Sequence, residues 1–582
     1  MNLSDEQLCM LEQFCYLDKN VAEAAGIDGF TGINQFRGKT LEEVLDKFDD
    51  KALAQLEKMD KKGAIDGALA SGPEWARTIK SLKSDKELSK LTIGNEMMTN
   101  QKGTALAFNV YDKSDPSNVV VAFKGTTGAE EWDDNARGLN ISDTPCQKEA
   151  LDYIESLAAP NITVTGHSKG ANKAMYVSIT SSKVNRCVAF DGQGFSQEFI
   201  DKYWAEIEAR GANVTNYSLS ADFVHILMFP VPNSNQVYCE GYGVDDFKQN
   251  HSPNSFYKID KDGHIISILE KAQETESMTM LHEFTTFLLN NTSAEEKAAV
   301  ADYLGPLLAA AMAGGDFEDP KGELKRCIAS NPDALATILA YLVKYIDVYE
   351  LSSEDVEKLV DVVMPSFLPN LAGKVAANSP LAQILVWALL YDIRGGASED
   401  DKFGQKISGL LNFFGIEDNV IGLDAWAFEK LLKIAGIDMD VSALFKKVHA
   451  KYDAIGTIDP IKGKANAQAK GGKIRDFSQK VYDGLTNTMG RIDQIPYPAV
   501  SAWGSYASEE WYSEIGVSQA MRAINQYYNK VSQANRNSKT RADAVFNNVH
   551  QIDAAYGKKL KTVTENLQKY KTAIKDLAQT IG

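Results

Sequence analysis

The feature that most restricts the fold of this chain is a short strand-like segment joined to a helix by a glycine-flanked turn. Residues 161–165 (NITVT) are rich in β-branched side chains, which favour a strand, and residues 170–181 are typical of a helix. The turn at 166–170 reads GHSKG. Glycines at both ends allow a sharp turn with close backbone contacts. The pattern predicts that the Ser168 hydroxyl stands clear of a sheet, between a strand and a helix.

Residues 1–290 alternate between strand-like and helix-like segments. Ser4 and Gln7 have the spacing of a capping box that opens a helix. Further strands are predicted at 104–111, 119–123, 186–190 and 213–219, and a further helix at 196–210. Alternation of this kind predicts a mostly parallel sheet covered by helices. Together with the GHSKG turn, it indicates an α/β fold of the α/β-hydrolase class over residues 1–290.

Residues 291–459 are predicted to form an all-α middle domain. Helix start signals precede the segments AEEKAAV and EDVEKLV, at Thr292 with Ser293 and at Ser352 with Ser353. Glycine pairs and prolines separate the helical segments along this stretch. No motif within it points to chemistry, so we expect any active site to lie in the domain that precedes it.

Residues 460–582 are predicted to form a third, helical domain of a different style. Its first part, 460–473, is rich in Lys, Gly and Ala and is typical of a linker. From Val549 to Ile581 apolar residues recur at every third or fourth position, which is the pattern of a coiled-coil seam, and 517–531 has a similar seam. Two interpretations remain open: a self-contained helical bundle, or a surface that receives helices of other proteins.

The charge of the chain is distributed unevenly. The formal net charge is −18, yet residues 461–582 carry 18 basic against 10 acidic residues, a net charge of +8 that leaves −26 for residues 1–460. Such a contrast indicates separate modules with separate partners. The aromatic residues of the basic end are not interleaved with its lysines as stacking platforms for bases would be. We therefore expect solvated helix faces there, and no nucleic-acid partner.

The cysteines and the N-terminus restrict the cellular setting. Six cysteines are scattered without a C-x-x-C pair, which argues against a disulfide framework and against a zinc site. No apolar run reaches the roughly 18 residues of a membrane span. The segment MNLSDEQLCMLEQFCYLDKN has neither a basic start nor an uninterrupted apolar core. A cleaved signal peptide is therefore not expected, and secretion would need another route.

A serine nucleophile needs a base, which in α/β-hydrolases is a histidine that follows it in the chain. His449 and His550 lie in the helical domains, and the side chain of His167, inside the turn, is predicted to point away. The remaining candidates are His225, His251, His264 and His282. His251 follows a loop and opens the segment HSPNSFY, which is a good position for a mobile base at the edge of a sheet.

The base in turn needs an acid that orients it, and the acid precedes the histidine in α/β-hydrolases. Asp222, in SADFVHILMFP, follows a predicted strand. Asp191, in VAFDGQG, ends another predicted strand. Since parallel strands end at the same edge of a sheet, both carboxylates suit the role, and the residues alone leave the choice between them open.

The chain from Met1 to about Asp260 resembles the class 3, or fungal-type, lipases, and more closely a bacterial lipase-like branch of that group. The matching segments, in the order of the family, are VVVAFKGTTGAEEW, ITVTGHSKGANKA, SADFVHILMFP and HSPNSFY. The resemblance implies Ser168 as the nucleophile, Asp222 as the acid and His251 as the base. One departure is Ala171-Asn172, where relatives often have a second glycine.

The same resemblance implies an oxyanion hole. Thr126, which follows Phe123-Lys124-Gly125, would supply one half of it, and the backbone N–H of Lys169 the other. Trp132 and Asn135 match the pattern of the family after the oxyanion loop and are expected to be structural. The implied chemistry is acyl transfer to water, without a metal or a cofactor.

The order of the domains carries a second resemblance. A hydrolase followed by a helical, seam-rich C-terminal domain, without a cleavable signal, is similar to the lipase effectors of Gram-positive type VII secretion, with an LXG-like targeting domain at the C-terminus. Trp503-Gly504 and the Tyr506…Glu510 pair resemble secretion motifs of helical substrates. This resemblance implies a protein made in the cytoplasm and secreted without a cleaved signal peptide. Its partners would be small helical, chaperone-like secretion proteins at residues 460–582 and an immunity protein.

The expected function is therefore hydrolysis of glycerolipid esters by a secreted antibacterial toxin. Membrane phospholipids, attacked in the manner of a phospholipase A, are the favoured substrate class. Two alternatives stay open. In one, the chain is an intracellular esterase or thioesterase whose helical domains serve oligomerisation. In the other, the hydrolase domain is catalytically idle and the protein is an adhesin or scaffold. The intact set Ser168, Asp222, His251 and Thr126 weighs against the idle scaffold.

Overall fold

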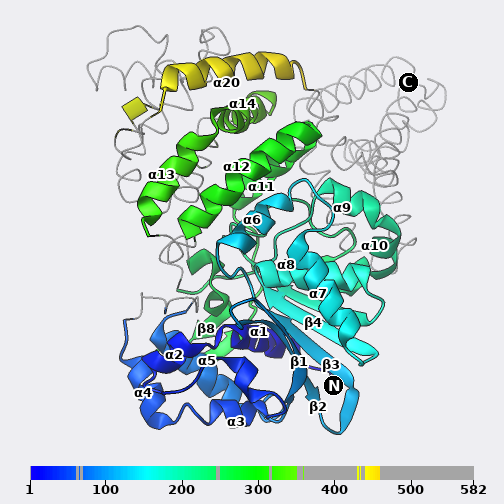
Figure 1. The fold of residues 1–582 in the computed structure, drawn as a ribbon, viewed down its shortest axis with the longest axis vertical. Coiled ribbons are helices and arrows are strands. Elements are labelled where there is room, and N and C mark those ends of the chain that lie inside the picture. Colours follow the sequence, from blue (N-terminus) through cyan, green and yellow to red (C-terminus); the bar gives the residue numbers. More distant parts are fainter. Residues whose placement is uncertain are drawn as a thin grey trace, which may run out of the picture. The chain divides into compact units, whose positions relative to one another are not determined.

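The structure is a computed structural model in which an α/β domain is followed by helices (Figure 1). The described residues are 2–60, 65, 70–243, 249–312, 318–349, 351, 355, 358, 429–430, 433 and 439–458. Nearly all of them belong to one compact unit, Met1–Asp347 with Leu351–Gly456. The predicted linker and coiled-coil seams within 460–582 lie outside the described residues.

Within the described residues, seven strands form one sheet in the order of the sequence. The strands are β1 (Thr92–Thr99), β2 (Ala105–Asp112), β3 (Asp115–Phe123), β4 (Asn161–His167), β5 (Val184–Phe190), β6 (Val214–Leu219) and β7 (Asn235–Cys239). Strands β1 to β3 pair antiparallel, whereas β3 to β7 pair parallel. The mostly parallel sheet predicted from the sequence is confirmed; β1 and β7 were not anticipated.

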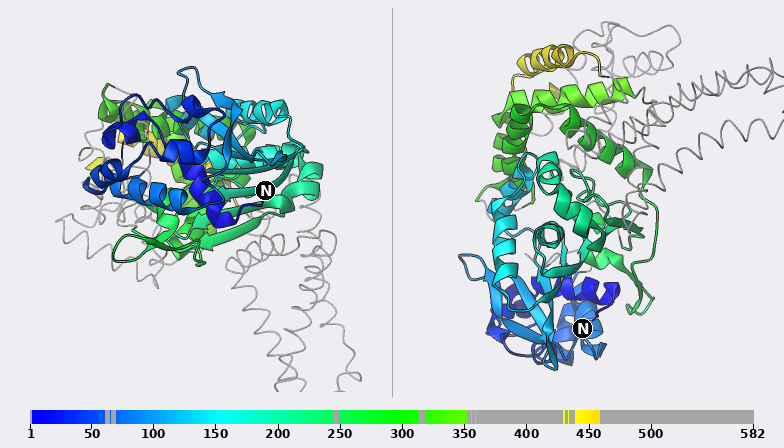
Figure 2. Two further views of the ribbon diagram at one scale, coloured as in Figure 1. Left: turned by 90° about the horizontal axis from the view of Figure 1, so that it is seen from below. Right: turned by 90° about the vertical axis from the view of Figure 1, so that its right-hand side faces the viewer.

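Helices cover both faces of this sheet (Figures 1 and 2). Because the parallel strands follow one another in order, right-handed crossovers place their connecting helices on one face. These helices are α7 (Pro145–Ser156), α8 (Lys169–Thr180), α9 (Gln197–Lys202) and α10 (Trp204–Arg210). Helix α1 (Asp5–Gln13) packs on the central strands β3, β4 and β5 from the other face. The single helix predicted at 196–210 is in fact the pair α9 and α10.

The N-terminal helices complete the cover. They are α1, α2 (Lys19–Ala24), α3 (Leu41–Leu45), α4 (Asp50–Glu57) and α5 (Gly72–Ser84). The predicted capping box at the start of α1 is present, because the Gln7 N–H donates to the Ser4 hydroxyl at 3.2 Å and the Ser4 N–H donates to the Gln7 side chain at 2.8 Å. Fully buried apolar side chains from α1, α5 and β2 form the core beneath the sheet, among them Leu8, Leu11 and Phe108.

A helical part follows the sheet. Its helices are α11 (Glu276–Asn291), α12 (Ala294–Met312), α13 (Pro320–Ser330), α14 (Pro332–Val348) and α20 (Val441–Ile455). Helix α12 packs on α6 (Ala129–Arg137), where a Cβ at Gly305 would lie 2.7 Å from an oxygen of Asp133. The absence of a side chain at Gly305 therefore permits close helix contact. The boundary predicted at residue 291 stays a prediction.

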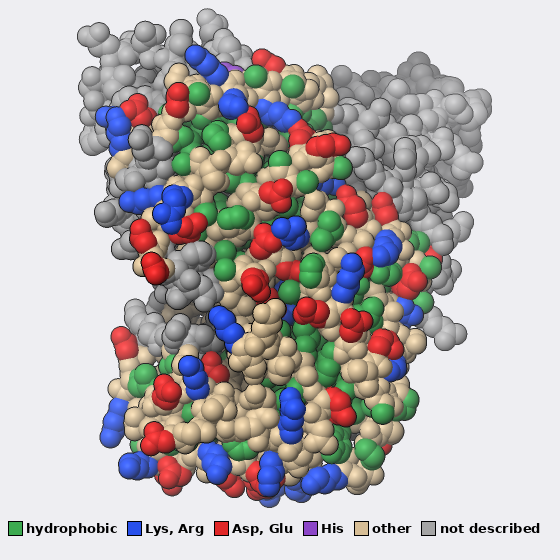
Figure 3. Space-filling view, in the orientation of Figure 1, with side chains coloured by type: hydrophobic (Ala, Val, Ile, Leu, Met, Phe, Trp, Pro, Cys, Tyr) green, Lys and Arg blue, Asp and Glu red, His purple; other side chains and the backbone are tan. Residues whose placement is uncertain are grey.

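Three further observations concern the surface, the cysteines and the helices of this fold. Side chains of both charge signs are interspersed over the face shown in Figure 3, as on an ordinary water-exposed surface. All six cysteines are free thiols, and five of them are buried. Among the described helices, none is long and apolar enough to cross a membrane.

Two buried ion pairs join α6 to α8. The Lys169 ammonium lies 2.6 Å from a carboxylate oxygen of Asp134, and the Lys173 ammonium bonds to the Glu131 carboxylate. Both lysine side chains are fully buried. A buried charge without its partner is strongly destabilising, so the pairs hold the two helices together in one arrangement.

We expect Lys173→Met to lower the free energy of unfolding by about 3–5 kcal/mol, because the Glu131 carboxylate is left buried without its cation. The matched control is Lys39→Met, since the Lys39–Glu43 pair is about half exposed. That substitution is expected to change the free energy by less than about 1 kcal/mol. Urea midpoints from pulse proteolysis of the full chain measure both, and equal effects would contradict a structural role for the buried pair.

Candidate active site

Ser168 occupies a strained turn between β4 and α8. Its backbone has φ 59° and ψ −124°, a conformation that side-chain-bearing residues rarely adopt. The flanking glycines are required by space, since a Cβ at Gly170 would lie 2.2 Å from the carbonyl oxygen of Phe123, and one at Gly166 would lie 2.5 Å from the backbone of Gly170. The close backbone contacts predicted for the GHSKG turn are therefore present.

The loop after β3 lies beside this serine. A Cβ at Gly125 would be only 3.4 Å from the Cβ of Ser168. The Gly125 N–H donates to the Tyr16 hydroxyl at 3.0 Å, and the Thr127 N–H donates to the Glu131 carboxylate. Two side chains from different helices thus hold the loop against the nucleophile turn.

The two residues expected to form the oxyanion hole come from these adjacent segments. The Asn135 side-chain amide donates to the hydroxyl oxygen of Thr126 at 3.0 Å, so the Thr126 hydroxyl proton remains available to another acceptor. Lys169 is the first residue of α8, and its backbone N–H therefore has no partner four residues earlier within the helix. Its side chain points instead into the buried ion pair with Asp134.

His251 and Asp222 are joined by a short hydrogen bond. Asp222 is fully buried in the turn after β6, and His251 ends the short 3-10 helix η4 (Gln249–His251). The His251 Nδ1 lies 2.7 Å from a carboxylate oxygen of Asp222. The other ring nitrogen of His251, Nε2, is buried without a hydrogen-bond partner in the described part of the chain. One ring nitrogen of His251 is therefore oriented by Asp222, and the other has no hydrogen-bond partner among the described residues.

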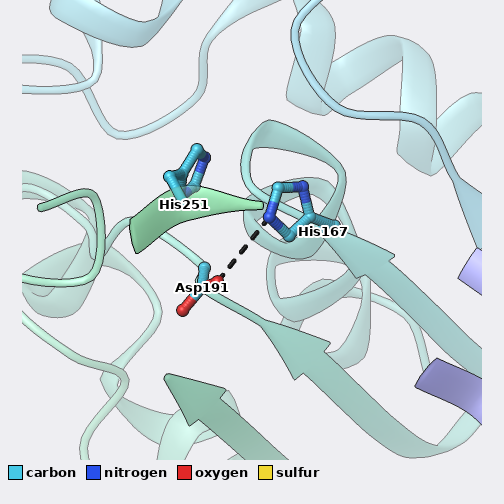
Figure 4. A group of neighbouring side chains, drawn as sticks. All are labelled: His167, Asp191 and His251. Carbon is cyan, nitrogen blue, oxygen red and sulfur yellow. Dashed lines mark ion pairs between the residues drawn. The ribbon is translucent and has the colours of Figure 1, made fainter. Parts of the chain in front are cut away.

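His167 differs from the prediction that its side chain points away from the site. Its ring packs against that of His251, with centroids 4.6 Å apart and planes inclined by 36°. Figure 4 shows the two rings with Asp191 beneath them. The distance between His167 Nε2 and an Asp191 oxygen is 3.7 Å. On its other side, the His167 Nδ1 lies 3.4 Å from the Tyr16 hydroxyl. His167 thus contacts His251 on one side and, on the other, Tyr16, which holds the loop at Gly125.

His167, Asp191 and His251 bring three potential metal-ligand atoms within 4.8 Å of one another. Nitrogen lone pairs lie in the plane of an imidazole ring. Packing of the His167 ring against the His251 ring therefore favours van der Waals contact over ligation of a shared ion. The Asp222 hydrogen bond also occupies one nitrogen of His251.

Electrostatics separates the two candidate acids. Burial opposes ionisation of Asp222, but the charges and hydrogen bonds of His251 and His225 outweigh it and hold the Asp222 pKa below its usual range. Burial, with the nearby Asp222 charge, raises the pKa of Asp191 well above its usual range. Burial likewise lowers the pKa of His167. Asp191 and His167 are therefore neutral neighbours, whereas Asp222 is the ionised partner of His251.

The other histidines lie on other parts of the fold, although one of them also bonds to Asp222. His225 bonds to Asp222 from the opposite side to His251, and also to Glu274. His264 is exposed beside Asp260, in the turn between β8 (Tyr257–Ile259) and β9 (Ile265–Ile268). His282 lies on α11 and His449 on α20. The site residues that sequence reasoning missed are Tyr16 and Glu274, for which no local motif gives a signal.

The fold and the site together define a lipase-like α/β-hydrolase domain: a serine on a strained strand–helix turn, a histidine held by a buried carboxylate, and donors on the adjacent loop. Residues 67–241 match a phospholipase-like family model described as the Tle-like phospholipase domain. The matched region includes Thr126, Ser168 and Asp222 and ends before His251. No curated protein and no solved structure matches the chain. The match supports a lipase-like domain in this part of the chain.

We expect Asp191→Asn to gain stability relative to the unchanged chain as the pH rises from 5 to 8. An aspartate with a raised pKa holds its proton in the folded state where the unfolded state has lost it, so stability falls with rising pH in this window. Asn has no such proton, and the difference grows by up to about 1.4 kcal/mol per pH unit.

Urea unfolding across this pH range measures the difference. The control is Asp112→Asn, because hydrogen bonds from Ser114 lower the pKa of the exposed Asp112 and leave it ionised throughout the window. Its effect on stability is expected to be independent of pH. A pH-independent effect of Asp191→Asn as well would contradict the neutral state of Asp191.

Proposed function

We propose that the chain is a serine phospholipase in which Ser168 is the nucleophile, His251 the general base and Asp222 the orienting acid. The observation that carries the proposal is the 2.7 Å hydrogen bond between the buried, ionised Asp222 and His251 Nδ1. Nε2 of His251 has no hydrogen-bond partner among the described residues, and the His251 ring packs on His167, the neighbour of Ser168 in the turn. The match to the Tle-like phospholipase domain supports a lipid ester as the substrate.

The first half of the reaction acylates the serine. Nε2 of His251 accepts the Ser168 hydroxyl proton as Oγ attacks the ester carbonyl carbon. The negative charge that develops on the carbonyl oxygen accepts hydrogen bonds from the Lys169 N–H and the Thr126 hydroxyl, whose proton the Asn135 contact leaves free. The protonated His251 then donates to the leaving alcohol, and the ester bond breaks.

The second half releases the acyl group. Water enters in place of the alcohol, loses a proton to His251 Nε2 and attacks the acyl carbon. The same two donors stabilise the second oxyanion, and His251 returns the proton to Ser168 as the free acid departs. Asp222 keeps the imidazole in the tautomer with a proton on Nδ1 in both halves, and it stabilises the imidazolium that forms twice in the cycle.

The substrate class within the lipids is part of the proposal. A phospholipase A-type cleavage of membrane glycerophospholipids agrees with the match to the Tle-like phospholipase domain and with the class 3 lipase resemblance of the sequence. The thioesterase alternative uses the same triad, and hydrolysis rates on phospholipid vesicles and on acyl thioesters separate the two. The idle scaffold is opposed by the pairing of His251 with Asp222 and of Thr126 with Asn135.

We expect Asp222→Asn to lower kcat/KM for ester hydrolysis by about three to four orders of magnitude, because the wrong tautomer of His251 is then favoured. Asp191→Asn is the matched control, since Asp191 is a neighbouring buried aspartate that does not bond to His251. Its activity is expected to stay within about tenfold of the unchanged chain. Ser168→Ala sets the blank, with activity at background and folding unaltered. A reversed order of the two aspartates would assign the acid to Asp191, and residual turnover in Ser168→Ala would remove the nucleophile assignment.

The biological setting is proposed from the sequence alone: a toxin secreted through a type VII route, with small helical proteins on residues 460–582 and an immunity protein as partners. The support is the seam from Val549 to Ile581 and the net charge of +8 on residues 461–582. Apolar side chains at this spacing would each contribute roughly 1.5–3 kcal/mol when fully buried against another helix, enough to drive association.

We expect the triple replacement Leu560→Ser, Val563→Ser and Leu567→Ser to abolish the complex with a small helical protein encoded beside this chain. Ester hydrolysis should be unchanged, because the substitutions lie outside the α/β domain. Co-purification of the two proteins measures the complex. A complex that survives the triple replacement, or an unchanged chain that binds none of its encoded helical neighbours, would refute the targeting role of this domain.

A further inference from the structure

The carboxylate of Asp222 serves two histidines, not one. One oxygen accepts the bond from His251 Nδ1, and the other accepts from His225 Nδ1 at 3.0 Å. The second oxygen also accepts the backbone N–H groups of Val224 at 3.0 Å and His225 at 2.7 Å. Both oxygens are therefore held, and Asp222 cannot rotate without breaking several hydrogen bonds.

His225 lies between two carboxylates. Its Nδ1 faces Asp222, and its Nε2 lies 2.7 Å from an oxygen of Glu274. An ionised carboxylate only accepts hydrogen bonds, and a neutral imidazole has a single N–H, so both contacts are satisfied only by the imidazolium. Burial by itself would lower the pKa of His225, but the hydrogen bonds to Asp222 and Glu274 raise it to about 10. The ring is a buried cation across the whole neutral range.

The remaining groups around His225 carry no charge. The ring of Tyr238, on β7, lies 5.5 Å away, and that of His282, on α11, lies 6.5 Å away. Burial, together with Glu274, raises the pKa of Tyr238, and burial lowers the pKa of His282. The charged set at this position is therefore Asp222, His225 and Glu274.

Glu274 comes from the segment that leads into α11. Its second oxygen accepts the Thr279 hydroxyl at 2.8 Å, and burial of Glu274 is outweighed by the His225 hydrogen bond, which holds the Glu274 pKa below its usual range. The next residue, Thr275, donates its N–H to Ser220 in the turn that contains Asp222, at 2.8 Å. The turn that contains Asp222 and the segment that leads into α11 are thus joined twice, through His225 and through the Thr275–Ser220 hydrogen bond.

We propose that His225 is a positioning residue of the active site: it fixes the carboxylate of Asp222 and, through its positive charge, sets the pH above which His251 acts as a base. The inference rests on the proposed serine hydrolase function. A cation on the far side of Asp222 offsets part of the carboxylate charge felt by His251. The imidazolium of His251 is then less stabilised, so the neutral base is present at lower pH.

The test is the pH dependence of kcat/KM for the full chain and for His225→Gln, between pH 4.5 and 9, with a short-chain soluble ester. Gln removes the charge of the ring but keeps an amide N–H donor, at the position of the Nε2 nitrogen that faces Glu274. The backbone N–H groups of Val224 and of residue 225 still hold the Asp222 oxygen. The acid limb is expected to move to higher pH by about 1 to 2 units, the effect of one unit charge on the opposite side of a shared carboxylate in a protein interior. At the plateau, kcat should fall by no more than about tenfold and KM should be unchanged.

The matched control is His282→Gln. His282 is also a histidine beside His225, it is neutral, and no hydrogen bond joins it to Asp222. Loosened packing alone would move both variants alike, whereas the proposal requires that the acid limb of His282→Gln stay at its original position. An unmoved limb in His225→Gln, or equal shifts in both variants, would overturn the proposal.

A second measurement does not depend on activity or on the stability of His225→Gln. Imidazole nitrogen NMR of the Ser168→Ala chain reports the protonation of each histidine ring, and the His225 signals are assigned by their loss in His225→Gln or, if that variant does not fold, in His225→Asn. We expect both nitrogens of His225 to stay protonated up to at least pH 8. A neutral ring at pH 7 would overturn the proposal. An unchanged chain without esterase activity would instead contradict the proposed function, and the NMR result would still decide the charge of His225.

Discussion

The close approach of three backbone segments at the ends of β3 and β4 is the constraint on which the rest of the site depends. The turn around Ser168 fits only because Gly166 and Gly170 present no Cβ to the Phe123 carbonyl and to each other. The same region brings Gly125 so close to the serine that a Cβ at Gly125 would lie 3.4 Å from the Ser168 Cβ, and helix α8 begins at the residue after the serine. One steric requirement therefore sets the positions of the proposed nucleophile and of both proposed oxyanion donors, and the positive φ of Ser168 is the strain that accompanies it.

The second constraint is that a buried charged side chain needs a counter-charge beside it. Lys169 and Lys173 are each matched by a carboxylate of α6, and Asp222 is matched by histidines. Where no partner is available, burial favours the neutral form: the pKa of Glu12, whose carboxyl oxygens have no partner among the described residues, is raised well above its usual range. Among these buried groups, the ionised ones are thus those with a counter-charge beside them, which is why Asp222 and not Asp191 is suited to stabilise an imidazolium.

The parts of this arrangement that are local in the sequence were predictable. The GHSKG turn, the β-branched strands and the capping box at Ser4 each depend on residues a few positions apart, and the α/β class follows from their alternation. Choosing between Asp191 and Asp222 was not possible from the residues alone, because both follow strands that end at one edge of the sheet. Tyr16, which is 109 positions from Gly125, and Glu274, which is 49 positions from His225, carry no motif. Their roles depend on tertiary contacts that no short pattern encodes, and the direction of His167 was mispredicted for the same reason.

The helical part that follows the sheet is physically connected to the candidate site, although the sequence analysis predicted it as a separate domain. Glu274 precedes α11, the hydroxyl of Thr285 on α11 donates to the backbone of Ile226 at 2.8 Å, and α12 packs on the helix that follows the oxyanion loop. The segment that carries the acid and the segment that carries the oxyanion donor are therefore each braced by a different helix beyond the sheet. A displacement of α11 would act on Asp222 through His225, whereas a displacement of α12 would act on Thr126 through α6. Both helices belong to the same compact unit as the sheet, so the helices on either side of residue 291 are physically connected to the α/β domain. An isolated fragment that ends at residue 290 keeps the predicted triad but lacks α12, the support of the oxyanion loop.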